Sequence, residues 1–199
     1  MKSLEEMFAD VSALIAARPQ IAEAAREEAD EEARLVRGIP EGYRWARVGS
    51  PLMAERIKAS GPLPVVAPTG AVFVGPAGAG KTSYAVAWLI KLRQSGVRGT
   101  FVHSHTLARA RQDSGFGHTP VVVERSVKAR LLLIDDLGNE PKIEASSVSE
   151  VIFDRHAESR PTWVTTAFSP QQIADRYGDG IARRVFERAQ VIRLGKVTK

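Results

Sequence analysis

The chain contains no cysteine, so disulfide bonds, thiolate nucleophiles and cysteine metal sites are all excluded. A protein without cysteine suits a reducing compartment. Long apolar runs are also missing, because no stretch approaches the roughly 18 residues that a membrane-spanning helix needs. The first ten residues lack the cationic and then apolar layout of a signal peptide. We therefore expect a cytoplasmic protein with no part in the membrane.

The composition is that of an ordinary globular protein. Of the 199 residues, 44% are apolar and 26% are charged, and a chain of this length favours one domain with at most a small appendage. The formal net charge is +5, yet residues 1–40 hold five basic and nine acidic side chains. The acidic start and the basic remainder indicate different partners, although solvated surface explains the imbalance equally well.

The chain is predicted to divide into a helical extension at residues 1–60 and a core at residues 61–199. Three prolines within residues 62–68 exclude regular helix and indicate a linker between the two parts. The extension either docks on a partner or packs on the protein's own core, and the sequence leaves both alternatives open.

Capping signals mark the helices of the extension. Ser3 and Glu6 have the spacing of a capping box in front of apolar residues at helical spacing. A second helical stretch covers residues 20–37. Ser50 before Pro51 predicts an N-cap and a third helix that ends near residue 60.

From residue 70 onward, short apolar runs alternate with helical stretches. The expected strands are residues 71–74, 100–102, 131–134, 162–166 and 191–193. The expected helices among them are residues 81–94 and 145–158. Apolar runs that alternate with helices are typical of a parallel sheet whose two faces are covered by helices. The predicted fold class is therefore α/β.

A glycine-rich segment with the P-loop pattern follows the first expected strand. The segment and the residue after it are Gly75, Pro76, Ala77, Gly78, Ala79, Gly80, Lys81, Thr82 and Ser83. Glycines let the backbone close around phosphate, while Lys81 reaches the β and γ phosphates and the Thr82 hydroxyl can ligate Mg²⁺. We expect these residues to bind a nucleoside triphosphate.

Two adjacent aspartates, Asp135 and Asp136, follow the strand expected at residues 131–134. Ligands of open α/β sheets bind at this end of the strands. One carboxylate there can hold Mg²⁺, and the next can orient or deprotonate the attacking water. We assign Asp135 to the metal and Asp136 to the water, with ATP and Mg²⁺ as the cofactors. The second half lacks a guanine-selective Asn-Lys-x-Asp segment, which argues against a GTPase.

The segment from Leu131 to Pro141 resembles the Walker B region of the DnaC/IstB branch of the AAA+ ATPases. Further agreement lies at residues 39–44, 152–155, 159–162, 164–166, 169–172 and 181–185. Ser169 and Gln172 also have the spacing of a capping box that opens a helix. The resemblance covers roughly residues 39–195 and implies an AAA+ core whose ATP-bound subunits associate side by side. It also implies that Arg184 acts as an arginine finger on the neighbour's γ-phosphate, with the adjacent Arg183 as the alternative.

Two departures from the family pattern affect the predicted chemistry. Ala167 stands where this branch usually has asparagine after two threonines, so no side chain there can position water. Slow hydrolysis follows unless Thr166 takes over that role. The sequence also leaves no room for a C-terminal helical lid behind the nucleotide.

The resemblance favours an ATP-dependent helicase loader for DNA replication. Its N-terminal helices would bind a replicative helicase, and its core would assemble on single-stranded DNA. The alternative is an IstB-like transposition helper ATPase that binds duplex DNA and a transposase. A third possibility is an ATP-dependent binding module that does not hydrolyse ATP, which the alanine at position 167 would permit.

Basic side chains gather toward the end of the sequence. Residues 176–199 hold seven basic and two acidic side chains, as suits contact with a phosphate backbone. More positive charge lies at Arg109, Arg111, Lys128 and Arg130. Phe116, in the loop at residues 114–118, is a candidate stacking platform for a base, although a glycine-flanked Phe more often packs in a core.

Overall fold

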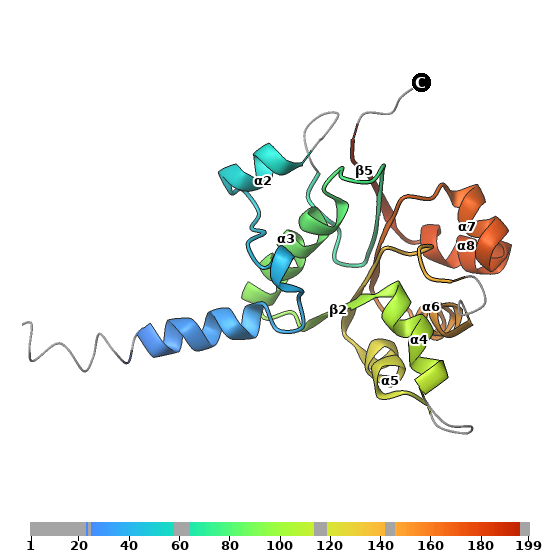
Figure 1. Ribbon diagram of the computed structural model, residues 1–199, viewed down its shortest axis with the longest axis horizontal. Coiled ribbons are helices and arrows are strands. Elements are labelled where there is room, and N and C mark those ends of the chain that lie inside the picture. The colour runs from blue at the N-terminus through green and yellow to red at the C-terminus, as the bar shows by residue number, and fades with distance from the viewer. Residues whose placement is uncertain (1–22, 24, 58–63, 114–118, 142–145, 196–199) are drawn as a thin grey trace, which may run out of the picture. The chain divides into compact units, whose positions relative to one another are not determined.

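The computed structural model describes residues 23, 25–57, 64–113, 119–141 and 146–195 (Figure 1). The chain divides into two compact units, residues 1–37 and 38–199. In the first unit, residues 25–35 are helical, as the sequence predicted. The helix expected after Ser3 and the loop residue Phe116 lie outside the described residues. The partner-binding role of the extension stays a prediction.

The second unit is built on a five-stranded sheet, which confirms the α/β prediction. Its strands run in the order β2-β3-β4-β1-β5, and all four pairings are parallel. The strands are β1 (Gly70–Val74), β2 (Gly99–His103), β3 (Leu131–Asp135), β4 (Thr162–Thr166) and β5 (Gln190–Arg193). Each lies within one residue of its expected range.

Helices cover both faces of the sheet. They are η1 (Glu41–Tyr43, a 3-10 turn), α2 (Pro51–Arg56), α3 (Lys81–Gln94), α4 (Ser104–Asp113), α5 (Val121–Lys128), α6 (Ser146–Ala157), α7 (Pro170–Tyr177) and α8 (Asp179–Phe186). Figure 1 shows α3 on one side of the sheet and α4 to α8 on the other. None of the helices within the described ranges is long and apolar enough to cross a membrane.

The core lies between these layers. On the side of α3, Phe73 packs edge-on against Tyr84 and Trp163, with ring centroids 6.0 and 5.9 Å away. On the other side, Val72 and its sheet neighbours pack against Leu107, Val151 and the rest of one apolar cluster. Burial on both faces explains why the strands read as continuous apolar runs.

The predicted caps and helix ends are largely correct, with one exception. Ser50 accepts a hydrogen bond from the Met53 backbone N–H at 3.2 Å, and Ser169 forms a full capping box with Gln172. The helix that was expected to reach residue 60 ends at Arg56 instead. The next residue, Ile57, takes an extended backbone conformation and is buried.

A buried arginine joins α6 to the amino-terminal edge of the sheet. Arg155 has no exposed surface, and its Nε donates to the Thr162 hydroxyl at 2.9 Å. Its Nη atoms donate to the carbonyl oxygens of Ser126, Val127, Ala129 and Pro161. Burial lowers the pKa of Arg155 to about 10, so the side chain stays charged at neutral pH. The guanidinium therefore satisfies the last carbonyls of α5, which would otherwise be orphaned.

We expect Arg155→Lys to destabilise the core by about 3 kcal/mol, because an ammonium cannot reach all five acceptors and leaves buried carbonyls unpaired. Urea unfolding at pH 7 measures the loss as a lower midpoint. The control is Arg125→Lys, an exposed position on α5, which should change the stability by less than about 0.5 kcal/mol. Equal midpoints for the two variants would contradict the role given to this guanidinium.

Candidate nucleotide site

The glycine-rich segment forms the connection between β1 and α3. Gly80 is the N-cap of α3 and has a φ of 86°, which favours glycine. At Gly75, a Cβ atom would come within 2.1 Å of the Leu194 carbonyl oxygen. The loop can therefore close against the end of β5 only because this residue lacks a side chain. The N–H groups at the start of α3 point into the loop, where an anion is favoured.

The Lys81 ammonium lies over the same loop. It is buried, and its Nζ donates to the Pro76 carbonyl oxygen at 3.0 Å. Burial lowers the pKa of Lys81, while the charges of Asp136 and Asp135 act in the opposite direction. Of the other predicted phosphate ligands, Pro76, Ala77 and Gly78 are exposed, Ala79 is buried, and Thr82 and Ser83 are half-buried.

Asp135 links three elements of the fold. Its Oδ1 accepts hydrogen bonds from the hydroxyls of Thr82 on α3, at 2.8 Å, and Thr165 on β4, at 2.7 Å. Its Oδ2 lies 3.1 Å from Nδ1 of His103 at the end of β2. The side chain has no exposed surface. The structure thus brings together the P-loop threonine and the aspartate that the sequence assigned to one metal.

Asp136 occupies a strained backbone position that two hydroxyls support. Its φ is 56°, in the left-handed region that glycine favours and that asparagine and aspartate adopt more often than other residues, at a cost in strain. Its N–H donates to the Thr165 hydroxyl at 2.9 Å, and its carbonyl accepts from Ser104 at 2.8 Å. Burial and the neighbouring Asp135 raise the pKa of Asp136, whereas Lys81 lowers it. This arrangement turns the Asp136 side chain away from the strand direction and holds it near Lys81.

The hydroxyl of Thr166 is occupied by backbone groups. It donates to the Leu137 carbonyl at 2.7 Å and accepts from the Phe168 N–H at 3.1 Å, and the side chain is fully buried. Ala167 is exposed. Of the two threonines at the end of β4, Thr165 is the one that contacts both aspartates.

Three neighbours of the site were missed at the level of sequence: Thr165, His103 and Tyr43. The Asp135 carboxylate raises the pKa of the His103 imidazole, and burial opposes it. Burial raises the pKa of the Tyr43 hydroxyl, Asp135 raises it further, and a hydrogen bond to Thr82 lowers it. The only signal for His103 was its place at a strand end, because β2 and β3 pair with His103 opposite Asp135.

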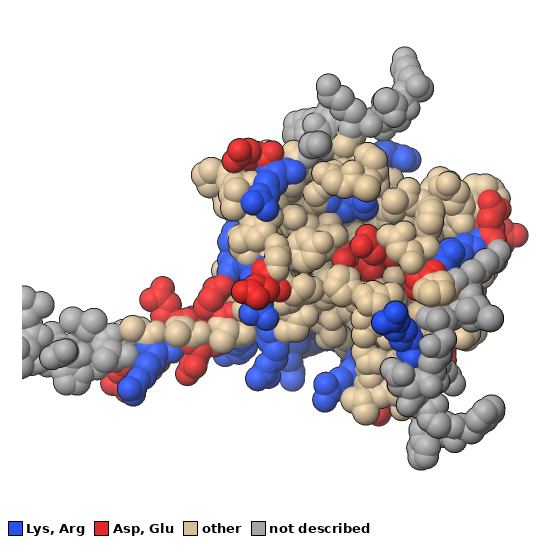
Figure 2. Space-filling view, viewed as in Figure 1, with Lys and Arg blue, Asp and Glu red and all other residues tan. Residues whose placement is uncertain are grey.

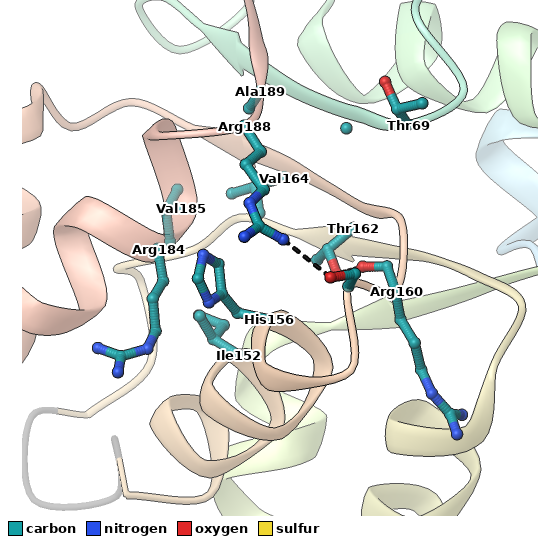
Figure 3. A pocket seen from close by; sticks show the side chains of 12 residues that line it. Thr69, Ile152, His156, Arg160, Thr162, Val164, Arg184, Val185, Arg188 and Ala189 are labelled. Carbon is teal, nitrogen blue, oxygen red and sulfur yellow. Dashed lines mark hydrogen bonds between the residues drawn. The ribbon is translucent and has the colours of Figure 1, made fainter.

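Arg184 is not part of this cluster. Its Nη1 donates to the Gly180 carbonyl at 2.8 Å, and its guanidinium lies 4.6 Å from the centre of the Phe153 ring. It lines a small cavity with Gly70 and Thr162, which begin β1 and β4, whereas the P-loop follows the end of β1. Figure 3 shows Arg184 pointing away from that cavity. Arg183, the alternative finger, lies 3.7 Å from Glu187.

The residues at the carboxyl edge of the sheet suit a magnesium-bound triphosphate. The Thr82 hydroxyl and the Asp135 carboxylate supply oxygen ligands of the kind that Mg²⁺ prefers, and Mg²⁺ usually needs few protein ligands beside substrate phosphates. The Oδ2 atom of Asp135 is buried and receives no hydrogen bond of good geometry from the described residues. A buried carboxylate oxygen without a donor is a feature that a cation would explain.

Comparisons with known proteins identify a family of ATP-binding proteins and solved structures of similar fold. A family model described as "IstB-like ATP binding protein" matches residues 66–190. The crystal structure of the DnaC helicase loader is 26% identical, with a TM-score of 0.57 over 63% of this chain and 77% of that chain. The DnaI structure is 23% identical, with a TM-score of 0.56 over 72% and 79%. A putative primosome component from Streptococcus pyogenes serotype M3 is 17% identical, with a TM-score of 0.58 over 81% and 92%. No curated protein sequence shows significant similarity.

The raised pKa of Asp136 predicts that this side chain costs stability. Its charged form is disfavoured in the folded state, so the cost is present at pH 7 and disappears as the pH falls below the ordinary value of about 3.9. We expect Asp136→Asn to raise the urea midpoint at pH 7 in magnesium-free protein, since asparagine also tolerates a positive φ. The gain should shrink toward pH 4. A lower midpoint at pH 7, or an equal gain for Asp154→Asn on α6, would contradict this account.

Proposed function

Since the chain belongs to the family of IstB-like ATP binding proteins, whose model matches more than half of it, we propose that it hydrolyses ATP and loads a replicative helicase onto single-stranded DNA. The chain is an ATP-binding protein of the AAA+ fold that resembles the DnaC and DnaI helicase loaders. The proposal adds three points to ATP binding: ATP hydrolysis, the use of Mg²⁺, and a partner in DNA replication.

The main support for hydrolysis is the hydrogen-bonded group formed by Thr82, Asp135 and Thr165. In the proposal, Thr82 and Asp135 hold Mg²⁺, which neutralises charge on the phosphates. Lys81 binds the phosphates, in exchange for its present bond to Pro76. Asp136 orients the attacking water and accepts its proton, and burial beside Asp135 raises its pKa, which makes it a better proton acceptor than an ordinary aspartate.

Arg184 would complete the site of a neighbouring subunit rather than its own. It lies with residues that begin β1 and β4, while the P-loop follows the other end of β1. A finger supplied by a neighbour stabilises the charge of the transition state and makes hydrolysis depend on assembly. The stacking of Arg184 on Phe153 holds it at the surface of α8 in the isolated subunit.

A helicase loader is supported by two features of different kinds. The DnaC helicase loader is 26% identical over 63% of this chain. Residues 1–40 are acidic, with a helix at residues 25–35, whereas the rest of the chain is basic. In the proposal this extension binds the helicase while the core binds DNA.

A transposition helper is the second candidate, because the matching family model is that of IstB-like proteins. Such a protein would bind duplex DNA and a transposase in place of a helicase and single-stranded DNA. The two candidates share the ATP site and differ in the partner that the extension recognises.

Hydrolysis is tested by phosphate release with and without DNA. We expect Asp136→Asn to keep ATP binding and lose at least about 100-fold in rate, because the general base is removed. Thr165→Val should slow hydrolysis at least about tenfold, since it frees both aspartates from their shared hydroxyl. Thr166→Val is the matched control with a smaller effect. Full activity in Asp136→Asn would remove the proposed base, and a wild type that binds ATP without releasing phosphate would establish a binding module instead.

The partner is tested by capture of the replicative helicase of the same organism in the presence of ATP. We expect the full chain to capture it and residues 38–199, which form a compact unit, to lose capture while still binding ATP. Equal capture by both chains would contradict a role for residues 1–37 of the extension. Capture of a transposase together with duplex DNA, and not of the helicase, would favour the second candidate.

A further inference from the structure

A cleft of about 650 Å³ opens at the amino-terminal edge of the sheet, away from the nucleotide site. We call it the amino-edge cleft; it is lined by Arg98, Thr100, Lys128, Ala129, Arg130, Ser159, Arg160 and Pro161. Half of these residues are basic, and no Asp or Glu of the described chain lines it. Figure 2 shows basic side chains gathered along the lower edge of the molecule, in the region below α3 and β2.

The basic residues of the amino-edge cleft come from three connections that lie side by side. Arg98 precedes β2, Arg130 precedes β3 and Arg160 precedes β4, and these three strands are neighbours in the sheet. Neighbouring strands are about 4.8 Å apart. The fold therefore sets guanidinium groups in a row along the sheet edge.

This row carries more positive charge than its hydrogen bonds and ion pairs within the described protein use. Arg155 and Arg160 donate to backbone carbonyls at the end of α5, as cations at helix C-termini often do, and Arg160 also forms an ion pair with Glu158. Arg98 and Arg130 are exposed and have no hydrogen bond or ion pair within the described residues. The Lys128 pair with Glu124, at 2.6 Å, is exposed and contributes little stability.

Another basic residue, Arg188, extends the basic surface from the cleft toward α8. A small cavity of about 60 Å³ shares Ser159 and Arg160 with the amino-edge cleft. Figure 3 shows Arg188 reaching from beyond α8 across this cavity, where it donates to the Ser159 hydroxyl at 2.9 Å. The Arg160 side chain points away from the small cavity in the same view.

We propose that the amino-edge cleft binds the phosphate backbone of DNA, at a site separate from the P-loop. Open, exposed arginines in a row suit a polymer of regularly spaced phosphates, which is held by charge rather than by base contacts. Among the described residues no aromatic side chain lines the cleft, so none of them offers a platform for base stacking there. The assignment rests on the proposed function in one respect, since that function requires DNA.

The test is fluorescence anisotropy of the full chain with a labelled 20-nucleotide single strand and with a 20-base-pair duplex, without nucleotide, over a series of salt concentrations. We expect Arg98→Gln/Arg130→Gln to weaken binding at least about tenfold and to lower the slope of log K against log salt by about 1.4 for single strands, or about 1.8 for duplex. Arg98→Lys/Arg130→Lys, which keeps the charge, should stay within about threefold of wild type.

The matched control is Arg26→Gln/Arg34→Gln, which removes two exposed charges from the extension and should leave DNA binding unchanged. Binding of either DNA form that depends on Arg98 and Arg130 supports the proposal, and preference for one form identifies the substrate. The proposal would be overturned if the wild type did not bind DNA. It would also be overturned if Arg98→Gln/Arg130→Gln and Arg26→Gln/Arg34→Gln lost DNA affinity equally. ATP binding and hydrolysis are measured on the same proteins, so an inactive ATPase that still binds DNA through this cleft would fail the proposed function and leave the cleft standing.

Discussion

The buried carboxylate of Asp135 is the constraint on which the site depends. A carboxylate without solvent contact is costly unless donors or a cation compensate it. Two hydroxyls, from α3 and β4, donate to its Oδ1 here, while Oδ2 lies 3.1 Å from the His103 imidazole on β2 without a hydrogen bond of good geometry. The P-loop helix is thereby fixed to three neighbouring strands, and a change in any of these elements reaches the same oxygen atoms.

The same arrangement destabilises the folded state at Asp136, the residue that is expected to take part in hydrolysis. Asp136 carries a positive φ and a second negative charge beside Asp135, and both features work against the folded state. The structure supports them with the hydroxyls of Thr165 and Ser104 and with the apolar cluster beneath. Surroundings that hold a site in an unfavourable geometry keep its side chains in place, so the proposed binding of phosphate requires little more than the exchange of the Lys81 bond to Pro76.

The sequence predicted what depends on local pattern and missed what depends on neighbours in space. The P-loop and the five strands follow from spacing and apolar runs. Helix α4 follows β2 without a turn signal, and α5 begins with three β-branched valines of low helix propensity, so neither was predicted. Choosing Thr165 over Thr166 requires knowing which hydroxyl faces Asp135. The buried Arg155 has the sequence appearance of an ordinary helix-surface residue, because its acceptors lie 6 to 29 positions away.

The polarity of a parallel sheet explains why the arginines are needed at the edge remote from the P-loop. Helices between parallel strands direct their positive N-termini to the carboxyl edge, which attracts phosphate there, and their negative C-termini to the amino edge. Without compensation the amino edge would repel DNA. Arg155 neutralises the carbonyls at the end of α5 from within, and the exposed Arg98 and Arg130 then reverse the sign of this edge. Five-residue strands separate the two edges by about 16 Å, and β4 joins them directly, with Thr165 at the aspartates and Pro161 just before its start at the cleft. Strand β4 is therefore the shortest physical connection between the nucleotide site and the proposed DNA site.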